Sequence, residues 1–169
     1  ELHISYTDGT KQVIKTDESW KCSTGPWRFD NIHVGATYDA SMEQEGWSQH
    51  SFDDSNWEWI KPATAPAPVL EAQTMPSITA TGTIDPVSVK KLNDSCYVFD
   101  MGINFAGVPQ LKVKGQKGTA ITLRHAEMMG PDGHIDQRNI NMHLRPRNAR
   151  EMIQTDIYIL KGLGKETFV

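Results

Sequence analysis

The sequence has few features of a membrane protein, a nucleic-acid-binding protein or a disulfide-rich scaffold. No apolar run reaches the roughly 20 residues that cross a bilayer, so no transmembrane helix is predicted. The formal net charge is −4 over 169 residues and no basic run occurs, which disfavours nucleic acid and anionic membranes as partners. Two cysteines, Cys22 and Cys96, are too few for a disulfide scaffold; they either pair with each other or remain small buried side chains.

Sequence motifs of common enzyme classes are also missing. There is no Gly-x-Ser-x-Gly elbow, no phosphate-binding loop and no dinucleotide fingerprint. The acidic residues that come into question as glycosidase carboxylates are Asp39, Glu43, Asp53, Asp54, Asp100 and Glu127. Their spacing singles out no facing pair, so we interpret them as surface charges and turn caps and predict no catalytic residue in this chain.

Metal-binding patterns are sparse. His125, His134 and His143 fit no spacing typical of a transition-metal site. Oxygen ligands occur in loop-like segments at Asp30-Asn31 and at Asp53-Asp54, so calcium is the cofactor that we consider, with Asp30 and Asn31 as its candidate ligands. The alternative for both segments is an Asx turn, in which the side chain bonds to its own backbone.

Short alternating runs of apolar and polar residues predict strands and little helix. Leu2, Ile4 and Tyr6 alternate with polar neighbours, and Asp8-Gly9 then favours a tight hairpin whose return strand covers residues 12–15. Further strands are expected over residues 96–101, 110–114, 120–125 and 155–160. Turn signals of this frequency indicate an all-β fold of jelly-roll-like β-sandwich segments.

Two stretches do not read as strands. Residues 61–86 contain five prolines and many alanines and threonines, which predicts an extended connector with a module boundary near residues 72–80. Residues 128–150 are rich in Asn, Arg and His after a Pro131-Asp132-Gly133 turn, which predicts a long irregular loop. The chain begins at Glu1 and ends at Val169 within a strand-like run, so we expect a piece of a longer protein.

Tryptophan is the most informative residue type. All five tryptophans crowd into 40 residues, at Trp20, Trp27, Trp47, Trp57 and Trp59. Flat aromatic rings suit the apolar face of a sugar, and neighbouring acids and amides suit its hydroxyl groups. Bulky rings also fill a small sandwich core, and that interpretation is favoured for most of these residues.

An ordered series of short motifs resembles bacterial α-L-rhamnosidases, in the β-sandwich region that precedes the catalytic barrel. The first block contains Trp20, Ser23-Thr24-Gly25-Pro26, Asn31-Ile32-His33-Val34-Gly35, Thr37-Tyr38-Asp39-Ala40, Glu43, Gly46-Trp47, Phe52-Asp53-Asp54-Ser55 and Trp57. The second block contains Phe99-Asp100-Met101-Gly102, Asn104, Ala106-Gly107, Gly118, His125-Ala126-Glu127, Asp132-Gly133, Arg138-Asn139, Asp156-Ile157-Tyr158 and Gly162. Each motif is short, but their order and spacing agree from about residue 18 to the last residue.

The resemblance implies a periplasmic or extracellular glycoside hydrolase that releases terminal L-rhamnose with inversion. Its catalytic carboxylates would lie in a downstream helical barrel outside this chain. Residues 1–75 would be the C-terminal part of an N-terminal, carbohydrate-binding-like β-sandwich module. Residues 76–169 would be the start of a second, concanavalin-like module. Ala36, Ser41 and Ile103 replace polar residues that are common in the family.

Two functional interpretations follow. In the first, the chain is an ancillary part of a rhamnosidase that binds a rhamnose-containing glycan, with Tyr38, Asp39, Glu43 and Trp47 as the candidate sugar ligands. In the second, it is a structural module that docks on the other domains of the same enzyme and binds no ligand. The first predicts exposed rings beside acids or amides, and the second predicts buried rings.

Overall fold

The computed structural model describes residues 1–64, 69, 71–144 and 153–169. By their internal contacts these residues form two compact units. Unit 1 consists of residues 1–24 and 44–76, and unit 2 consists of residues 25–43 and 77–169. The predicted module boundary at residue 75 stays a prediction, and each unit is described by itself.

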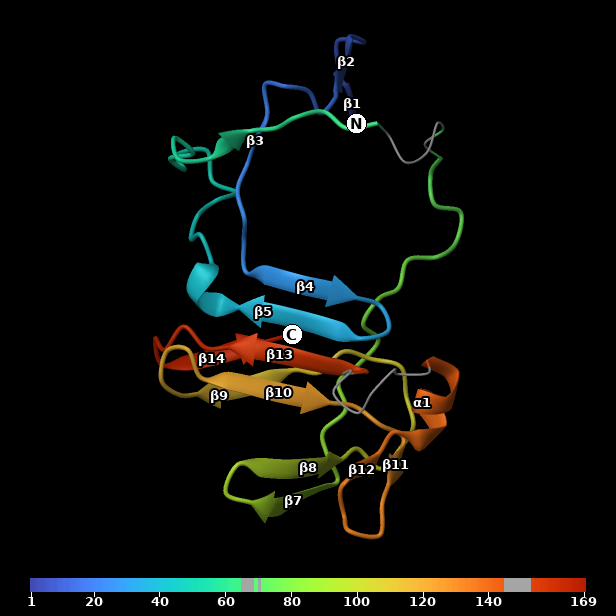
Figure 1. Cartoon of the computed structure of the whole chain (residues 1–169). Coiled ribbons are helices and arrows are strands. Elements are labelled where there is room, and N and C mark those ends of the chain that lie inside the picture. The colour runs from blue at the N-terminus through green and yellow to red at the C-terminus, as the bar shows by residue number, and fades with distance from the viewer. Residues whose placement is uncertain (65–68, 70, 145–152) are drawn as a thin grey trace. The chain divides into compact units, whose positions relative to one another are not determined.

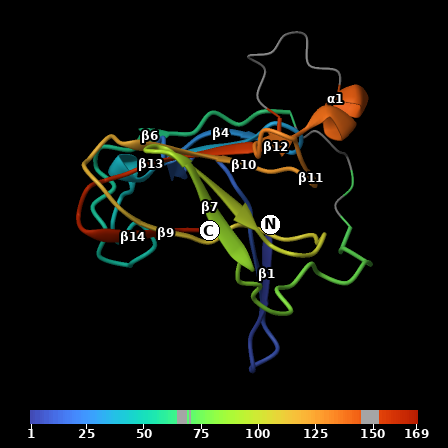
Figure 2. The same ribbon diagram turned by 90° about the horizontal axis from the view of Figure 1, so that it is seen from below.

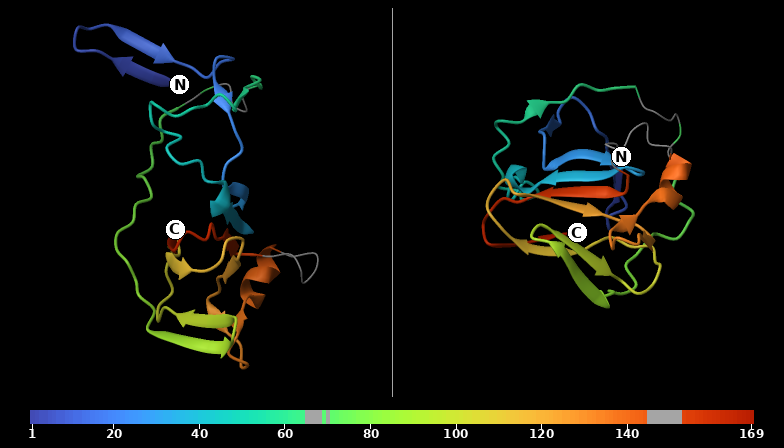
Figure 3. Two further views of the ribbon diagram at one scale, coloured as in Figure 1. Left: turned by 90° about the vertical axis from the view of Figure 1, so that its left-hand side faces the viewer. Right: turned by 60° about the horizontal axis from the view of Figure 1, so that its bottom comes forward.

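Unit 1 consists of two small antiparallel ribbons. The predicted hairpin is confirmed: β1 (Leu2–Ser5) pairs with β2 (Lys11–Ile14), as Figure 3 shows. Gly9 adopts a φ of +85° at the turn, and the Asp8 carboxylate accepts a hydrogen bond of 2.9 Å from the Thr10 N–H. The second ribbon pairs β3 (Lys21–Cys22) with β6 (Glu58–Trp59).

Unit 2 is built on a four-stranded sheet in the order β10-β13-β5-β4 (Figure 1). These strands are β4 (Trp27–Asn31), β5 (Gly35–Asp39), β10 (Ala120–Arg124) and β13 (Thr155–Ile159). Strands β13 and β5 are parallel, and the other neighbours are antiparallel. Gly35 permits the close approach of these two segments, because a Cβ atom there would overlap the backbone of Thr155.

A second pair of strands completes the core of unit 2. Strand β9 (Leu111–Lys114) pairs with β14 (Lys165–Phe168), and Figure 2 shows this pair as a layer apart from β4, β13 and β10. The buried apolar core contains Ala40, Tyr158, Leu160 and Phe168. Half-buried side chains from β5, β9 and β10 pack against this cluster. Apolar side chains from both sheets therefore share one core, as in a β-sandwich.

Smaller elements complete unit 2. They are a hairpin of β7 (Ser88–Asn93) and β8 (Cys96–Asp100), a hairpin of β11 (Met128–Met129) and β12 (Ile135–Asp136), the 3-10 turn η1 (Ala40–Met42) and the helix α1 (Arg138–Leu144). The prediction of an all-β fold is confirmed, since residues in strands far outnumber residues in helices. The strands expected from residues 96, 110, 120 and 155 are all present.

The two stretches expected to lack regular structure differ in outcome. The described residues between 61 and 86 carry no helix or strand, as expected, and residues 65–68 and 70 lie outside the description. The expectation of an irregular loop over residues 128–150 is wrong, because β11, β12 and α1 occupy much of it. Residues 145–150 lie outside the described residues. The turn at Asp132-Gly133 joins two short paired strands there, which the polar composition concealed.

Candidate functional site

The four predicted sugar ligands are divided between the two units. Tyr38 and Glu43 lie together in unit 2, where the tyrosine hydroxyl donates to the Glu43 carboxylate over 3.0 Å. Asp39 instead caps η1, because its carboxylate accepts hydrogen bonds from the backbone N–H and the hydroxyl of Ser41. Trp47 belongs to unit 1, where its side chain is exposed. Sugar binding by these residues stays a prediction.

Glu43 is part of an ion pair that no sequence pattern indicates. The Lys161 ammonium donates to the second Glu43 carboxylate oxygen over 2.7 Å, and both side chains are about three-quarters buried. Lys161 follows β13 and Glu43 follows η1, so the pair joins two segments that are 118 residues apart in sequence. Both oxygens of Glu43 are therefore bonded within the unit.

Glu166, on β14, forms the second half of this polar network. Only 5% of the residue is exposed, and its carboxylate accepts hydrogen bonds from the N–H groups of Lys161 and Gly162 over 3.0 and 2.8 Å. The Tyr158 hydroxyl donates a third bond to it over 2.9 Å. Both oxygens of the buried Glu166 carboxylate thus have hydrogen-bond donors, as burial of a charged group requires. We call Tyr38, Glu43, Tyr158, Lys161 and Glu166 the tyrosine–glutamate network.

The protonation behaviour of this network follows from its surroundings. Burial raises the pKa of Glu166, but the N–H donors of Lys161 and Gly162 and the Tyr158 hydroxyl outweigh burial and lower its pKa overall. Burial, together with the Glu43 carboxylate, raises the pKa of Tyr38 to about 12. Burial and Glu166 likewise raise the pKa of Tyr158. With the pKa of Glu166 lowered and the pKa of both tyrosines raised, the carboxylate is the acceptor and the tyrosine hydroxyl groups are the donors at neutral pH.

Aromatic rings pack against the two tyrosines of the network. The Tyr38 ring lies 5.9 Å from Tyr158, and Tyr158 lies 4.9 Å from Phe168 in a stacked arrangement. Trp27 meets Tyr38 edge-on at 4.9 Å. Tyr158 and Phe168 belong to the buried core, so the polar network is anchored in the best-packed part of unit 2.

The sequence carried one signal that could have revealed Glu166. Strand β14 alternates exposed and buried residues, so Glu166 and Phe168 point to the same buried side. A carboxylate on the inward face of a strand needs donors nearby. No comparable signal exists for Lys161, whose partner Glu43 lies far away in sequence.

A second polar cluster of unit 2 lies around the end of β10. His125 contacts the Asp156 carboxylate over 3.1 Å, and the other oxygen of Asp156 accepts from the Ala36 N–H. The buried Gln137 side chain donates to the backbone carbonyls of His125 and Ile153. These bonds join β5, β10 and β13 to the segment that precedes α1. The motif residue His125 therefore has a structural role in unit 2.

Asn139 adds a distinctive atom to this region. Its side-chain N–H donates to Glu127 over 3.0 Å. Its Oδ1 atom is the one buried side-chain acceptor without a hydrogen bond among the residues that the structure describes.

Asn31, one of the two predicted calcium ligands, forms a turn with its side chain, whereas Asp30 lies in β4. The Asn31 side chain accepts hydrogen bonds from the N–H groups of His33 and Val34 over 2.9 and 3.1 Å, which is the Asx geometry considered as the alternative. Within the described residues no group of three or more His, Cys, Asp or Glu side chains is placed to hold a metal ion. Asp30 and Asn31 on their own therefore fit a calcium site poorly, and calcium binding stays a prediction.

The tryptophans are more exposed than the sequence predicts. The interpretation as core residues is wrong for Trp20, Trp27, Trp47 and Trp59, all of which are exposed. Trp57 alone is half-buried; its ring meets Phe52 at 5.5 Å and its indole N–H donates to Gln44 over 2.8 Å.

Both cysteines are free thiols, Cys22 exposed and Cys96 half-buried, so neither a mutual disulfide nor full burial is found. No helix in the described part of the chain is long and apolar enough to cross a membrane.

These features define a class: a β-sandwich protein whose main buried carboxylate is held by structural hydrogen bonds. The N-terminal domain of α-L-rhamnosidases matches residues 1–82, and the concanavalin-like domain of bacterial α-L-rhamnosidases matches residues 90–169. The chain therefore belongs to the bacterial α-L-rhamnosidase family, as the motif series implied.

Individual relatives agree with this assignment. The chain is 33% identical over 169 residues to an α-L-rhamnosidase of Streptomyces avermitilis and 35% identical over 167 residues to one of Formosa agariphila. Each alignment covers 99% of this chain but only 16–17% of the relative. The solved α-L-rhamnosidase of Dictyoglumus thermophilum superposes with a TM-score of 0.85 at 33% identity, covering 99% of this chain and 18% of that one.

Proposed function

We propose that this chain is a non-catalytic β-sandwich part of an α-L-rhamnosidase whose whole chain releases terminal L-rhamnose from glycosides with inversion. The observation that carries the proposal is the coverage: the relatives named α-L-rhamnosidase match 99% of this chain, yet the chain spans 16–17% of their length. Enclosure of Glu166 by structural donors also supports a role without acid–base chemistry. We further propose that the enzyme acts in the periplasm or outside the cell.

An activity assay separates the two halves of this proposal. The 169-residue chain is expected to release no aglycone from an aryl α-L-rhamnoside, whereas the full-length protein that contains it is expected to turn over the same substrate. Turnover by the chain alone would refute the non-catalytic role. A full-length protein that is inactive on rhamnosides but cleaves another glycoside would refute the assigned activity.

We also propose that the chain contributes to binding a rhamnose-containing glycan. Four exposed tryptophans support this role, because exposed rings are available for a sugar face. Calorimetry with L-rhamnose, in the presence of calcium and after chelation, tests both the binding and its dependence on calcium. Saturable heat that disappears after chelation would support Asp30 and Asn31 as calcium ligands. Equal heat in both conditions would exclude a calcium ion from the binding of the sugar.

The second candidate function is a scaffold that docks on the remaining domains of the same enzyme. Its prediction of buried rings is wrong for four of the five tryptophans, but the tyrosine–glutamate network favours it, because the polar atoms of Tyr38 and Glu43 form hydrogen bonds within the unit. The scaffold alone predicts no heat with L-rhamnose. It also predicts that deletion of this region from the full-length protein lowers its thermal stability more than it raises the KM for an aryl rhamnoside.

A further inference from the structure

The β3–β6 ribbon of unit 1 places a cation beside an exposed indole ring. Lys21 and Trp59 are direct partners across the two strands, so their side chains stand on the same face. The Lys21 ammonium lies 4.9 Å from the centre of the Trp59 ring, a cation–π distance. The tryptophan is nevertheless 62% exposed, so much of its surface remains accessible in unit 1.

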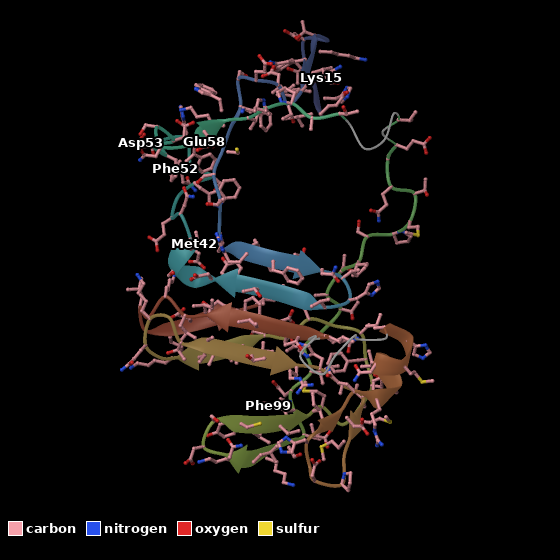
Figure 4. All side chains as sticks on the ribbon, in the orientation of Figure 1. Lys15, Met42, Phe52, Asp53, Glu58 and Phe99 are labelled. Atoms are coloured by element: carbon pink, nitrogen blue, oxygen red, sulfur yellow. The ribbon has the colours of Figure 1, made fainter. Side chains whose placement is uncertain are left out.

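A carboxylate fixes the position of this cation. The Lys21 ammonium donates to the side chain of Asp54 over 2.9 Å and to the Asp54 backbone carbonyl over 3.1 Å. An ammonium group has three N–H donors; two of them bond to Asp54, and the same ammonium lies over the Trp59 ring. Asp54 itself is half-exposed. A flat apolar surface, a donor and an acceptor therefore lie next to one another, in the segment around Phe52, Asp53 and Glu58 labelled in Figure 4.

We propose that Trp59, Lys21 and Asp54 form a subsite for a neutral deoxyhexose residue, of which L-rhamnose is the example; this rests on the proposed glycan-binding role. The C–H face and methyl group of a deoxy sugar would stack on the indole ring. The half-exposed Asp54 carboxylate, which Lys21 holds in place, would accept hydrogen bonds from its hydroxyl groups. Lys21 and Asp54 neutralise each other, so the subsite selects an uncharged sugar over an acidic one.

Trp47 is the natural comparison. It lies in the same unit, is similarly exposed at 65%, and was the tryptophan predicted from the sequence as a sugar ligand. Among the described residues no cation lies over the Trp47 ring, whereas Lys21 lies over the Trp59 ring. The two residues therefore form a matched pair that differs in polar surroundings.

The test is a titration of the 169-residue chain with methyl α-L-rhamnoside, followed by NMR of the five indole N–H signals. The Trp59 signal, assigned by its loss in Trp59→Ala, is expected to shift saturably, and the Trp47 signal is not. Trp59→Ala is expected to weaken binding about tenfold or more, Lys21→Met a few-fold, and Trp47→Ala not at all. Sorbitol, which has the hydroxyl groups without a ring face, is expected to cause no saturable shift.

Each alternative result has a defined meaning. Saturable binding that is lost in Trp47→Ala and retained in Trp59→Ala overturns this subsite but leaves the glycan-binding role. Absence of any saturable shift overturns both the subsite and glycan binding by this chain, while the rhamnosidase assay still decides the role of the parent enzyme. If Trp59→Ala perturbs the ribbon signals broadly, Trp59→Phe and Asp54→Asn replace it. Unchanged affinity in both of those variants overturns the subsite.

Discussion

The two units of this chain differ in how they keep their shape. Unit 2 contains every residue of the described chain that is buried, including the apolar core and Glu166. In unit 1 no described residue reaches that degree of burial, although it holds four of the five tryptophans. Unit 2 therefore has an apolar core of its own and unit 1 has almost none. Because burial of apolar surface is the main source of stability, we expect unit 2 to be the better stabilised of the two.

Hydrogen bonding shows the same contrast. In unit 1 many side-chain bonds are local, as in the turns at Asp8, Asp17 and Asp53, each of which accepts from the residue two positions later. In unit 2 side chains join segments more than a hundred residues apart, as Lys161 and Glu43 do. Local turn bonds stabilise only short ribbons, whereas bonds between distant segments stabilise the arrangement of the whole unit. We therefore expect mutations to act strongly in unit 2 and weakly in unit 1.

The largest effect is expected for Leu160→Ala. Leu160 is fully buried in the core of unit 2, with no exposed surface. Removal of its branched side chain should lower the free energy of unfolding by about 2–5 kcal/mol. Urea unfolding monitored by circular dichroism measures this change, and Leu163→Ala, at an exposed leucine of the same unit, should change it by less than about 0.5 kcal/mol. A loss from Phe52→Ala in unit 1 as large as that from Leu160→Ala would break the contrast between the units.

The second effect is expected for Glu166→Gln. Glutamine retains one acceptor oxygen but turns an N–H₂ group toward the donors that the carboxylate now serves, so buried N–H groups of Lys161 or Gly162 lose a partner. The free energy of unfolding should fall by about 1–3 kcal/mol.

The control for Glu166 is Glu127→Gln, at an exposed carboxylate of the same unit with one side-chain hydrogen bond. It should cost no more than about 0.5 kcal/mol. Equal losses in the two variants would show that burial of Glu166 adds nothing.

Local chemistry made part of this fold predictable. The β1–β2 hairpin follows from Asp8-Gly9, because an aspartate that bonds to its own backbone and a glycine with positive φ specify the turn within four residues. The alternation of apolar and polar residues, which is also a local pattern, predicted β8, β9, β10 and β13. The parallel pairing of β13 with β5 depends instead on contacts between residues about 120 positions apart, as in the bond from Ala36 to Asp156. No local pattern contains that information.

The candidate site was predicted in the same uneven way. Tyr38 and Glu43 were singled out as ligands and do lie together, but their bonds lead to Lys161 and the core. Trp47 belongs to the motif series and Trp59 does not, and spacing alone does not reveal the cross-strand partner of Trp59. The pairing of Lys21 with Trp59 became visible only with the register of β3 and β6.

A pH-dependent loss of stability at alkaline pH is expected from the network of unit 2. The pKa of Tyr38 is raised to about 12 in the fold, against an ordinary value near 10 in the unfolded chain. A raised pKa in the fold means that the contribution of Tyr38 is fully present below about pH 10 and is lost as pH rises toward 12. Urea midpoints between these pH values should fall more steeply in the unmodified chain than in Tyr38→Phe. Tyr97→Phe, at an exposed tyrosine, should keep the steep fall; equal slopes in all three proteins would contradict the role of Tyr38.

The smallest effect is expected for Asp54→Asn in unit 1. The carboxylate pairs with Lys21 over 2.9 Å, but Asp54 is half-exposed, so solvent and salt screen the attraction. The variant should lower the free energy of unfolding by about 0–1 kcal/mol, and a double-mutant cycle with Lys21→Met isolates the pair from other effects. A coupling energy as large as the loss in Glu166→Gln would mean that unit 1 holds its ribbon by a strong ion pair. A small coupling, together with weakened sugar binding in Asp54→Asn, would mean that Asp54 serves ligand binding more than stability.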